Sequence, residues 1–265
     1  MRRDTTKNAK GQDYNWSVRF VRSSSSLSDA SLALEPAKKG QRKSEKALEP
    51  DRSIYLAHIE AIRKAKQFIY IENHFFPGSS KHWLEETDYQ IHNDIPFEIT
   101  RKIISKIEKH EKFTVFILIP MWPNDDQEPD SYATQEILHF QRETMQFMYH
   151  EIALAIKEVS KRAKIKNTTM KPTDYLNFFC LGKTIHKKWK KWTGNFQITT
   201  DGSGKKRKRR WRYPPYVHAN LLIADDEQVI VSTANINERS MIGDRDTEAG
   251  ITAYQTLSDD TIISN

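Results

Sequence analysis

Apolar residues recur at two different spacings along this chain, and these spacings predict helices and strands in alternation. Helical spacing predicts helices from about residue 51 to 66, from near Pro96 to about 107, and from about 134 to 160. Short apolar or alternating runs predict strands at 15–22, 67–72, 113–119, 175–181, 217–224, 229–231 and 247–254. Strands that alternate with helices favour an α/β fold built as a layered sandwich.

The chain changes in composition near residue 50. Residues 1–50 contain one strand pattern, with Trp16, Val18 and Phe20 on one face, followed by stretches typical of a flexible polar linker. Residues 51–265 hold the remaining helical and strand patterns and are expected to form the folded unit. Within that unit, 183–213 is expected to be a long basic loop.

The most informative stretch, residues 216–235, predicts a β-hairpin with polar groups at one end. Alternation puts His218 and Asn220 on the same face of the first strand, about 6–7 Å apart. Asp225 lies in the turn, and the return strand ends in three polar side chains, Ser232, Thr233 and Asn235. A histidine beside neutral hydrogen-bond donors suits a site that binds a phosphate and exchanges a proton or phosphoryl group with it.

The spacing of these residues is His218-x-Asn220-x4-Asp225-x6-Ser232-Thr233-x-Asn235. It resembles the second catalytic motif of the phospholipase D superfamily, His-x-Lys-x4-Asp-x6-Gly-Ser-x-Asn, with asparagine at the lysine position and Ser-Thr at the Gly-Ser pair. Three more stretches are similar to eukaryotic, plant-type members: 69–76, 113–123 and 235–250. The alternative is an ordinary β-hairpin with a surface histidine.

The resemblance implies that the chain is one half of a two-fold pseudo-symmetric, layered α/β sandwich with a mixed sheet. It carries the second motif alone, because His110-Glu-Lys112, which also reads His-x-Lys, lacks the aspartate. Family members hydrolyse phosphatidylcholine-type phospholipids to phosphatidate and free headgroup through a phosphohistidine. One motif histidine attacks phosphorus and the other protonates the leaving alcohol, and His218 corresponds to the second.

By the same resemblance, a carboxylate holds the far ring nitrogen of His218. Glu248 is the candidate, with Asp246 behind it; the alternative for Glu248 is a surface carboxylate paired with Arg245. Four residues are candidates for phosphate binding: Asn220, Ser232, Thr233 and Asn235. Asp225 is expected to stabilise the turn rather than to contact substrate.

Among the departures from the family motif, Asn220 in place of lysine is expected to affect function most. A lysine there would place a full charge on the phosphate oxygens, and loss of one such preorganised stabiliser costs about 10²–10³ in rate. With one motif and no lysine, this chain alone is expected to be catalytically impaired. The alternative is a non-catalytic pseudoenzyme, or a truncated fragment, that binds phosphate or anionic lipid.

The formal net charge of the chain is 42 − 35 = +7. Seven basic residues between positions 205 and 212 match this whole excess in number. They are Lys205, Lys206, Arg207, Lys208, Arg209, Arg210 and Arg212. Because tryptophans lie near them in sequence, they favour contact with an anionic membrane, where each basic residue adds roughly 1 kcal/mol. A solvated loop and a nuclear-localisation-like run are alternatives, and nucleic acid is a less favoured partner.

The remaining signals concern location and partners. The sequence has neither a run of about 20 apolar residues nor a secretory signal, and its single cysteine, Cys180, is expected to be a core thiol. These features favour a cytoplasmic, peripheral membrane protein. No cofactor or metal site is evident, and no signal bears on calcium dependence. A phospholipid is the expected substrate, and a missing N-terminal half or a homodimer mate would complete the site.

Overall fold

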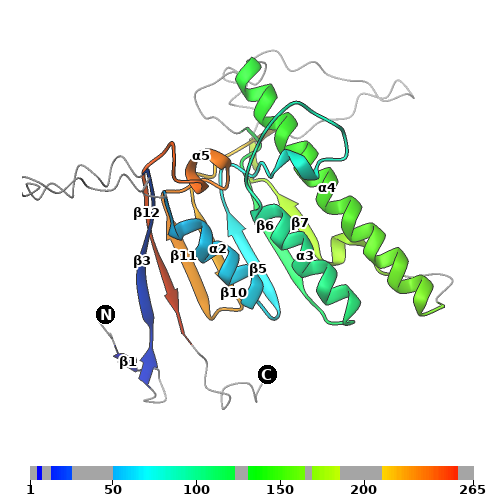
Figure 1. Ribbon diagram of the computed structural model, residues 1–265, viewed down its shortest axis with the longest axis horizontal. Coiled ribbons are helices and arrows are strands. Elements are labelled where there is room, and N and C mark those ends of the chain that lie inside the picture. The colour runs from blue at the N-terminus through cyan, green and yellow to red at the C-terminus, as the bar shows by residue number, and fades with distance from the viewer. Residues whose placement is uncertain are drawn as a thin grey trace, which may run out of the picture.

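The computed structural model describes residues 5–7, 13–25, 50–122, 131–164, 169–185 and 211–255. Its main element is an eight-stranded sheet with the strand order β4-β3-β12-β11-β10-β5-β6-β7 (Figure 1). Neighbouring strands are parallel from β5 to β7 and antiparallel elsewhere in this sheet. The predicted α/β fold with a mixed sheet is confirmed.

The strands of the main sheet are β3 (Ser17–Ser24), β4 (Asp51–Arg52), β5 (Phe68–Glu72), β6 (Thr114–Leu118), β7 (Leu176–Phe179), β10 (Leu221–Ala224), β11 (Gln228–Ser232) and β12 (Glu248–Tyr254). The helices are α2 (Ser53–Lys64), α3 (Ile95–Glu108), α4 (Tyr132–Arg162) and α5 (Glu238–Met241), with 3₁₀ turns η1 (Ser80–His82) and η2 (Pro172–Asp174). Two separate ribbons pair β1 (Thr5–Lys7) with β2 (Asp13–Asn15), and β8 (Lys183–Ile185) with β9 (Trp211–Tyr213).

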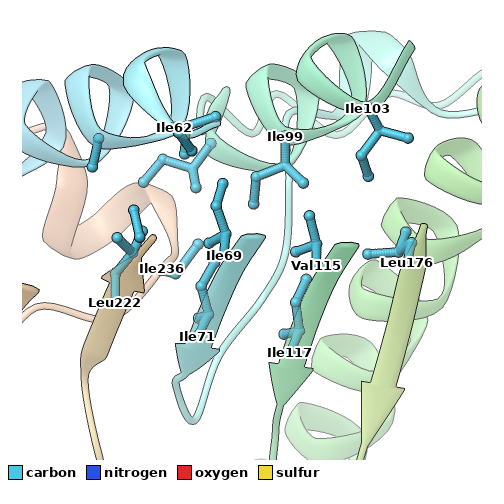
Figure 2. Packing of buried hydrophobic residues seen from close by; sticks show 14 of the residues in the cluster. Ile62, Ile69, Ile71, Ile99, Ile103, Val115, Ile117, Leu176, Leu222 and Ile236 are labelled. Carbon is cyan, nitrogen blue, oxygen red and sulfur yellow. The ribbon is translucent and has the colours of Figure 1, made fainter. Parts of the chain in front are cut away.

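The hydrophobic core lies between one face of the sheet and helices α2 and α3. Isoleucines from the helices, Ile62, Ile99 and Ile103, face Ile69 and Ile117 on the strands, and all five are 0% exposed (Figure 2). The helix α4 packs beside α3 and reaches the edge strand β7, where the hydroxyl of Tyr149 donates to the carbonyl of Leu176 (3.1 Å) (Figure 1). The 3.6-residue spacing of the helices and the apolar runs of the strands thus meet in one core.

The opposite face of the sheet, here called the open face, also carries apolar side chains, but these are exposed. They come from five strands: Val18 and Phe20 on β3, Ile251 on β12, Val231 on β11, Phe116 on β6 and Phe179 on β7. The pairing places Phe20 opposite Ile251, and Ile251 opposite Val231, so three of these side chains form a continuous row.

Three details differ from the sequence-based expectations. The N-terminal strand lies inside the sheet, between β4 and β12, so residues 17–24 belong to the folded unit, although the sequence predicts linker from Ser23 onward. Residues 26–49, the rest of the predicted linker, lie outside the described residues. The motif strand begins at Leu221 rather than at residue 217. The prediction that Cys180 is a core thiol is wrong, because β7 ends at Phe179 and leaves the cysteine exposed.

The predicted basic loop, 183–213, begins and ends in the β8–β9 ribbon. Residues 186–210, and with them Lys205 to Arg210, lie outside the described residues, and Arg212 is part of β9. No helix in the described part of the chain is both long and apolar enough to cross a membrane.

Candidate active site

The site begins with the hairpin of β10 and β11. Asp225 and Asp226 have φ angles of +54° and +57°, the left-handed conformation that both central residues of a type I′ turn adopt. The carboxylate of Asp225 accepts hydrogen bonds from the backbone N–H groups of Gln67 (2.7 Å) and Phe68 (2.9 Å), and also from that of Lys66. Asp225 therefore ties the hairpin to the start of β5, at the end of the sheet opposite to His218.

At the other end of the hairpin, Asn220 is bound to the segment that follows β11. The backbone carbonyl of Asn220 accepts from the N–H of Ser232 (3.2 Å), and its side-chain Nδ2 donates to the carbonyl of Thr233 (2.9 Å). The other side-chain atom, Oδ1, is buried and has no hydrogen-bond partner among the described residues. Where the motif would have a lysine, the structure thus presents an uncharged amide that already uses one of its two N–H donors.

Thr233 connects this segment to the next strand, β12. Its hydroxyl donates to the carboxylate of Glu248 and accepts from the backbone N–H of Ala249 (3.1 Å). Among the described residues, no hydrogen bond joins Glu248 to His218, so the role expected for this carboxylate stays a prediction. Asp246, the second candidate, instead forms a salt bridge with Arg239 (2.6 Å).

The remaining motif residues lie in the turn after β11. The hydroxyl of Ser232 accepts from the backbone N–H of Ala234 (3.2 Å), which shapes the turn. The side-chain Oδ1 of Asn235 is buried without a partner in the described chain, like Oδ1 of Asn220. Such atoms are rare in folded proteins and point to a ligand, an ion or ordered water.

His218 is exposed, and its ring lies against that of a second histidine, His74. The two ring centroids are 5.0 Å apart and the planes meet at 79°. The ring of Tyr216 completes the group, 5.7 Å from His218 and 6.0 Å from His74. Sequence reasoning did not select His74, which lies two residues beyond the end of β5.

His74 differs from His218 in its surroundings. The residue is 8% exposed, and its Nδ1 is buried with no hydrogen-bond partner among the described residues. Burial, together with the charge on His218, lowers the pKa of His74 to about 4. At neutral pH, therefore, His74 is an uncharged imidazole with one N–H donor and one acceptor nitrogen.

Asn73 holds the two halves of the site together. It is 1% exposed, and its side-chain oxygen accepts from the backbone N–H groups of Phe75 (3.0 Å) and Ile236 (3.1 Å). Its position thereby sets both the loop that carries His74 and the segment that carries Asn235. A site fixed by a buried side chain of this kind is preorganised.

The sequence matches the phospholipase D family over residues 2–262, which is nearly the whole chain. The chain belongs to the phospholipase D family. Its resemblance to plant-type members is confirmed by phospholipase D alpha 4 of Arabidopsis thaliana (39% identity, 93% of this chain and 30% of that protein) and phospholipase D delta of the same plant (41%, 91% and 26%). The chain therefore spans less than a third of the length of these relatives.

Among solved structures, a phospholipase D family member, Nuc from Salmonella typhimurium, shares 12% identity, covers 91% of this chain and 84% of its own, and superposes with a TM-score of 0.36. The family assignment rests on the sequence matches instead.

The described residues include no group of three or more His, Cys, Asp or Glu side chains arranged to hold a metal ion. None of the hydrogen bonds or ion pairs formed there by His218, Asn220, Thr233 or Glu248 involves a lysine or arginine. For a phospholipase D site, the group is thus rich in neutral polar atoms and poor in fixed positive charge.

Proposed function

We propose that this chain binds the phosphate group of a phosphatidylcholine-type phospholipid at the end of the β10–β11 hairpin. It acts there as one half of a phospholipase D-type phosphodiesterase, which would yield phosphatidate and the free headgroup. The observation that carries the proposal is the convergence of His218, Asn220, Thr233 and Asn235 at one end of the sheet, in a chain of this family.

In this role His218 is the general acid, because its exposed imidazole can reach a leaving oxygen in solvent-accessible space. Glu248 supports the site through Thr233, whose hydroxyl it holds. Ser232 shapes the turn that faces the phosphate, and Asn235 lies in that turn.

Turnover by the chain alone is expected to be poor. Asn220 offers the phosphate no charge, and one of its two N–H bonds is committed to the carbonyl of Thr233. A missing preorganised charge costs about 10²–10³ in rate.

A lipid is favoured over nucleic acid by an apolar groove at the same edge of the sheet. Because β5, β6 and β7 are parallel, the residues that follow them meet at one edge, which carries His74 after β5 and Met121 after β6. A groove of about 670 Å³, lined among others by Met121, Met145 and Tyr149, opens there. Apolar side chains at the same sheet edge as the proposed phosphate site suit an acyl chain better than a sugar-phosphate backbone.

The test uses the purified chain with glycerophosphocholine as a soluble probe and phosphatidylcholine vesicles as substrate. Calorimetry should detect weak glycerophosphocholine binding that His218→Ala reduces about 10-fold or more, while His92→Ala, on an exposed histidine, leaves it unchanged. Choline release from the vesicles should be undetectable. Binding that is insensitive to His218→Ala would refute the site, and choline release that His218→Ala abolishes would refute the impairment.

We also propose that the seven basic residues between 205 and 212 hold the chain at an anionic, cytoplasmic membrane face. Binding to phosphatidylserine-containing vesicles should fall steeply between low and high salt and disappear when all seven are replaced by glutamine. Equal binding to neutral vesicles would contradict this role, and tighter binding to single-stranded DNA would favour a nuclease-like function.

The partner that completes the site is proposed to cover the open face, either as a missing N-terminal half or as a second copy of this chain. The exposed row of Phe20, Ile251 and Val231 supports this, because contiguous apolar surface of this kind marks interaction sites. Light scattering over a concentration series should show a dimer that Phe20→Lys dissociates. A monodisperse monomer at all concentrations would rule out the homodimer.

A further inference from the structure

His74 lies where no motif assigns a functional residue, yet it is the nearest aromatic neighbour of His218 in the site. The two strands that lead to these histidines, β5 and β10, pair antiparallel, with Glu72 opposite Leu221. Continued past the end of that ladder, the same register brings the segment after Glu72 alongside the segment before Leu221. The ring contact of 5.0 Å between His74 and His218 follows from this pairing.

Packing alone does not account for His74. An edge-to-face contact would be equally available to phenylalanine, which has no nitrogen to desolvate. A buried nitrogen without a partner costs about 1–3 kcal/mol, and Nδ1 of His74 has none among the described residues. Two more buried atoms in the same site, Oδ1 of Asn220 and Oδ1 of Asn235, lack partners there as well. Both are acceptors, which ordered water can satisfy, so the unpartnered nitrogen of His74 is the atom that indicates a ligand with acceptor oxygens.

The chemistry of that ligand follows from what His74 can offer. The imidazole is uncharged at neutral pH, since its pKa is lowered to about 4. It therefore presents one N–H donor without the desolvation penalty of a buried cation. A phosphodiester carries its charge on two non-bridging oxygens, both of which accept hydrogen bonds. Asn220 does not supply the charged donor that a lysine would bring to these oxygens.

We propose that His74 is a phosphate-binding residue that donates a hydrogen bond to the same phosphate group as His218. In this arrangement a neutral N–H from the loop after β5 takes over part of the role of a lysine at position 220. The assignment rests on the proposed function, because it places a further ligand in that same site. It also requires the rigid loop that Asn73 and Gln141 provide, through the backbone N–H groups of Phe75 (3.0 Å) and Phe76 (3.1 Å).

The experiment follows the imidazole nitrogens of the whole ¹⁵N-labelled chain by NMR while inorganic phosphate is added. We expect the ring signals of His74 and His218 to shift together along one binding curve, while those of the exposed His92 stay unchanged. His74→Leu should weaken phosphate binding about 10-fold or more, the effect of one hydrogen bond to a charged group. His74→Gln, which restores a donor, should regain most of that affinity, and His92→Leu is the matched control.

Two results would overturn the assignment while leaving the proposed function intact. One is a shift of the His218 signals at saturating phosphate with no change at His74; the other is equal phosphate affinity in His74→Leu and His92→Leu. If neither histidine responds, the proposed function fails together with this assignment. Should His74→Leu not fold, the wild-type titration still decides, since it needs no substitution at this buried position.

Discussion

Both faces of the eight-stranded sheet carry apolar residues, but in opposite environments. On the face below α2 and α3, Ile69, Ile71 and Ile117 are 0% exposed, whereas on the open face Phe20 is 67% and Ile251 is 44% exposed. Strands that are apolar on both faces are typical of sheets covered on both sides. The strands of this sheet carry apolar residues on both faces, while among the described residues helices cover only one of them.

The largest expected effect is a difference in the free energy of unfolding between substitutions at two neighbouring positions of β6, one on each face of the sheet. Ile117→Ala, on the covered face, should lower the free energy of unfolding by about 2–5 kcal/mol because it leaves a cavity in a packed core. Phe116→Ala, on the open face, should cost about 1 kcal/mol or less. Denaturant unfolding of both variants at low protein concentration measures the difference. Equal costs would show that the open face is packed in solution, which a concentration series would attribute to a second copy.

A smaller effect is expected at Gly250 of β12, where a side chain would meet β11. A Cβ on Gly250 would lie 2.6 Å from Cβ of Ser232 and 2.9 Å from the carbonyl oxygen of Val231. Gly250→Ala should therefore destabilise the fold by about 1–3 kcal/mol through overpacking. It should also weaken phosphate binding, because Ser232 must move. Ala249→Ser, next to it and exposed, should change stability by no more than about 0.5 kcal/mol and serves as the control.

The smallest expected effect is a pH dependence of the free energy of unfolding, which arises in α2 on the helix-covered side of the sheet. Burial lowers the pKa of His58 in α2, whose Nδ1 donates to the carbonyl of Ile54 (2.9 Å). The unfolded chain, with a histidine pKa of about 6.5, therefore binds more protons than the folded one as pH falls below that value. The contribution of His58 to the free energy of unfolding is fully present above about pH 6.5. It is lost as the pH falls below that value, by up to about 1.4 kcal/mol per pH unit.

His58→Gln should flatten this slope, and His92→Gln, on an exposed histidine, should leave it unchanged. Urea unfolding at half-unit steps from pH 7 to pH 5 resolves the two variants. His74 adds to the same slope, because its pKa is lowered in the same direction. An unchanged slope in His58→Gln would mean that this ring is not buried as an uncharged group.

Local patterns in the sequence predict the three long helices. The helices at 53–64, 95–108 and 132–162 begin and end within about two residues of their predicted limits, because amphipathic spacing is a property of the segment itself. The turn at Asp225 was equally predictable, since aspartate tolerates the left-handed backbone that the turn requires. The family, too, was evident from the spacing between His218 and Asn235, although the lysine of that motif is absent.

Which strands are neighbours became known from the folded structure. It placed the N-terminal strand inside the sheet and set β5 beside β10, two strands separated by about 150 residues in the chain. That pairing brings His74 against His218, and the turn after β11 engages the amide of Asn220. Strand pairing depends on backbone hydrogen bonds that every residue except proline can make, so the strand sequences alone leave neighbour and register open. Burial of the whole core selects one arrangement, and the site is a consequence of that choice.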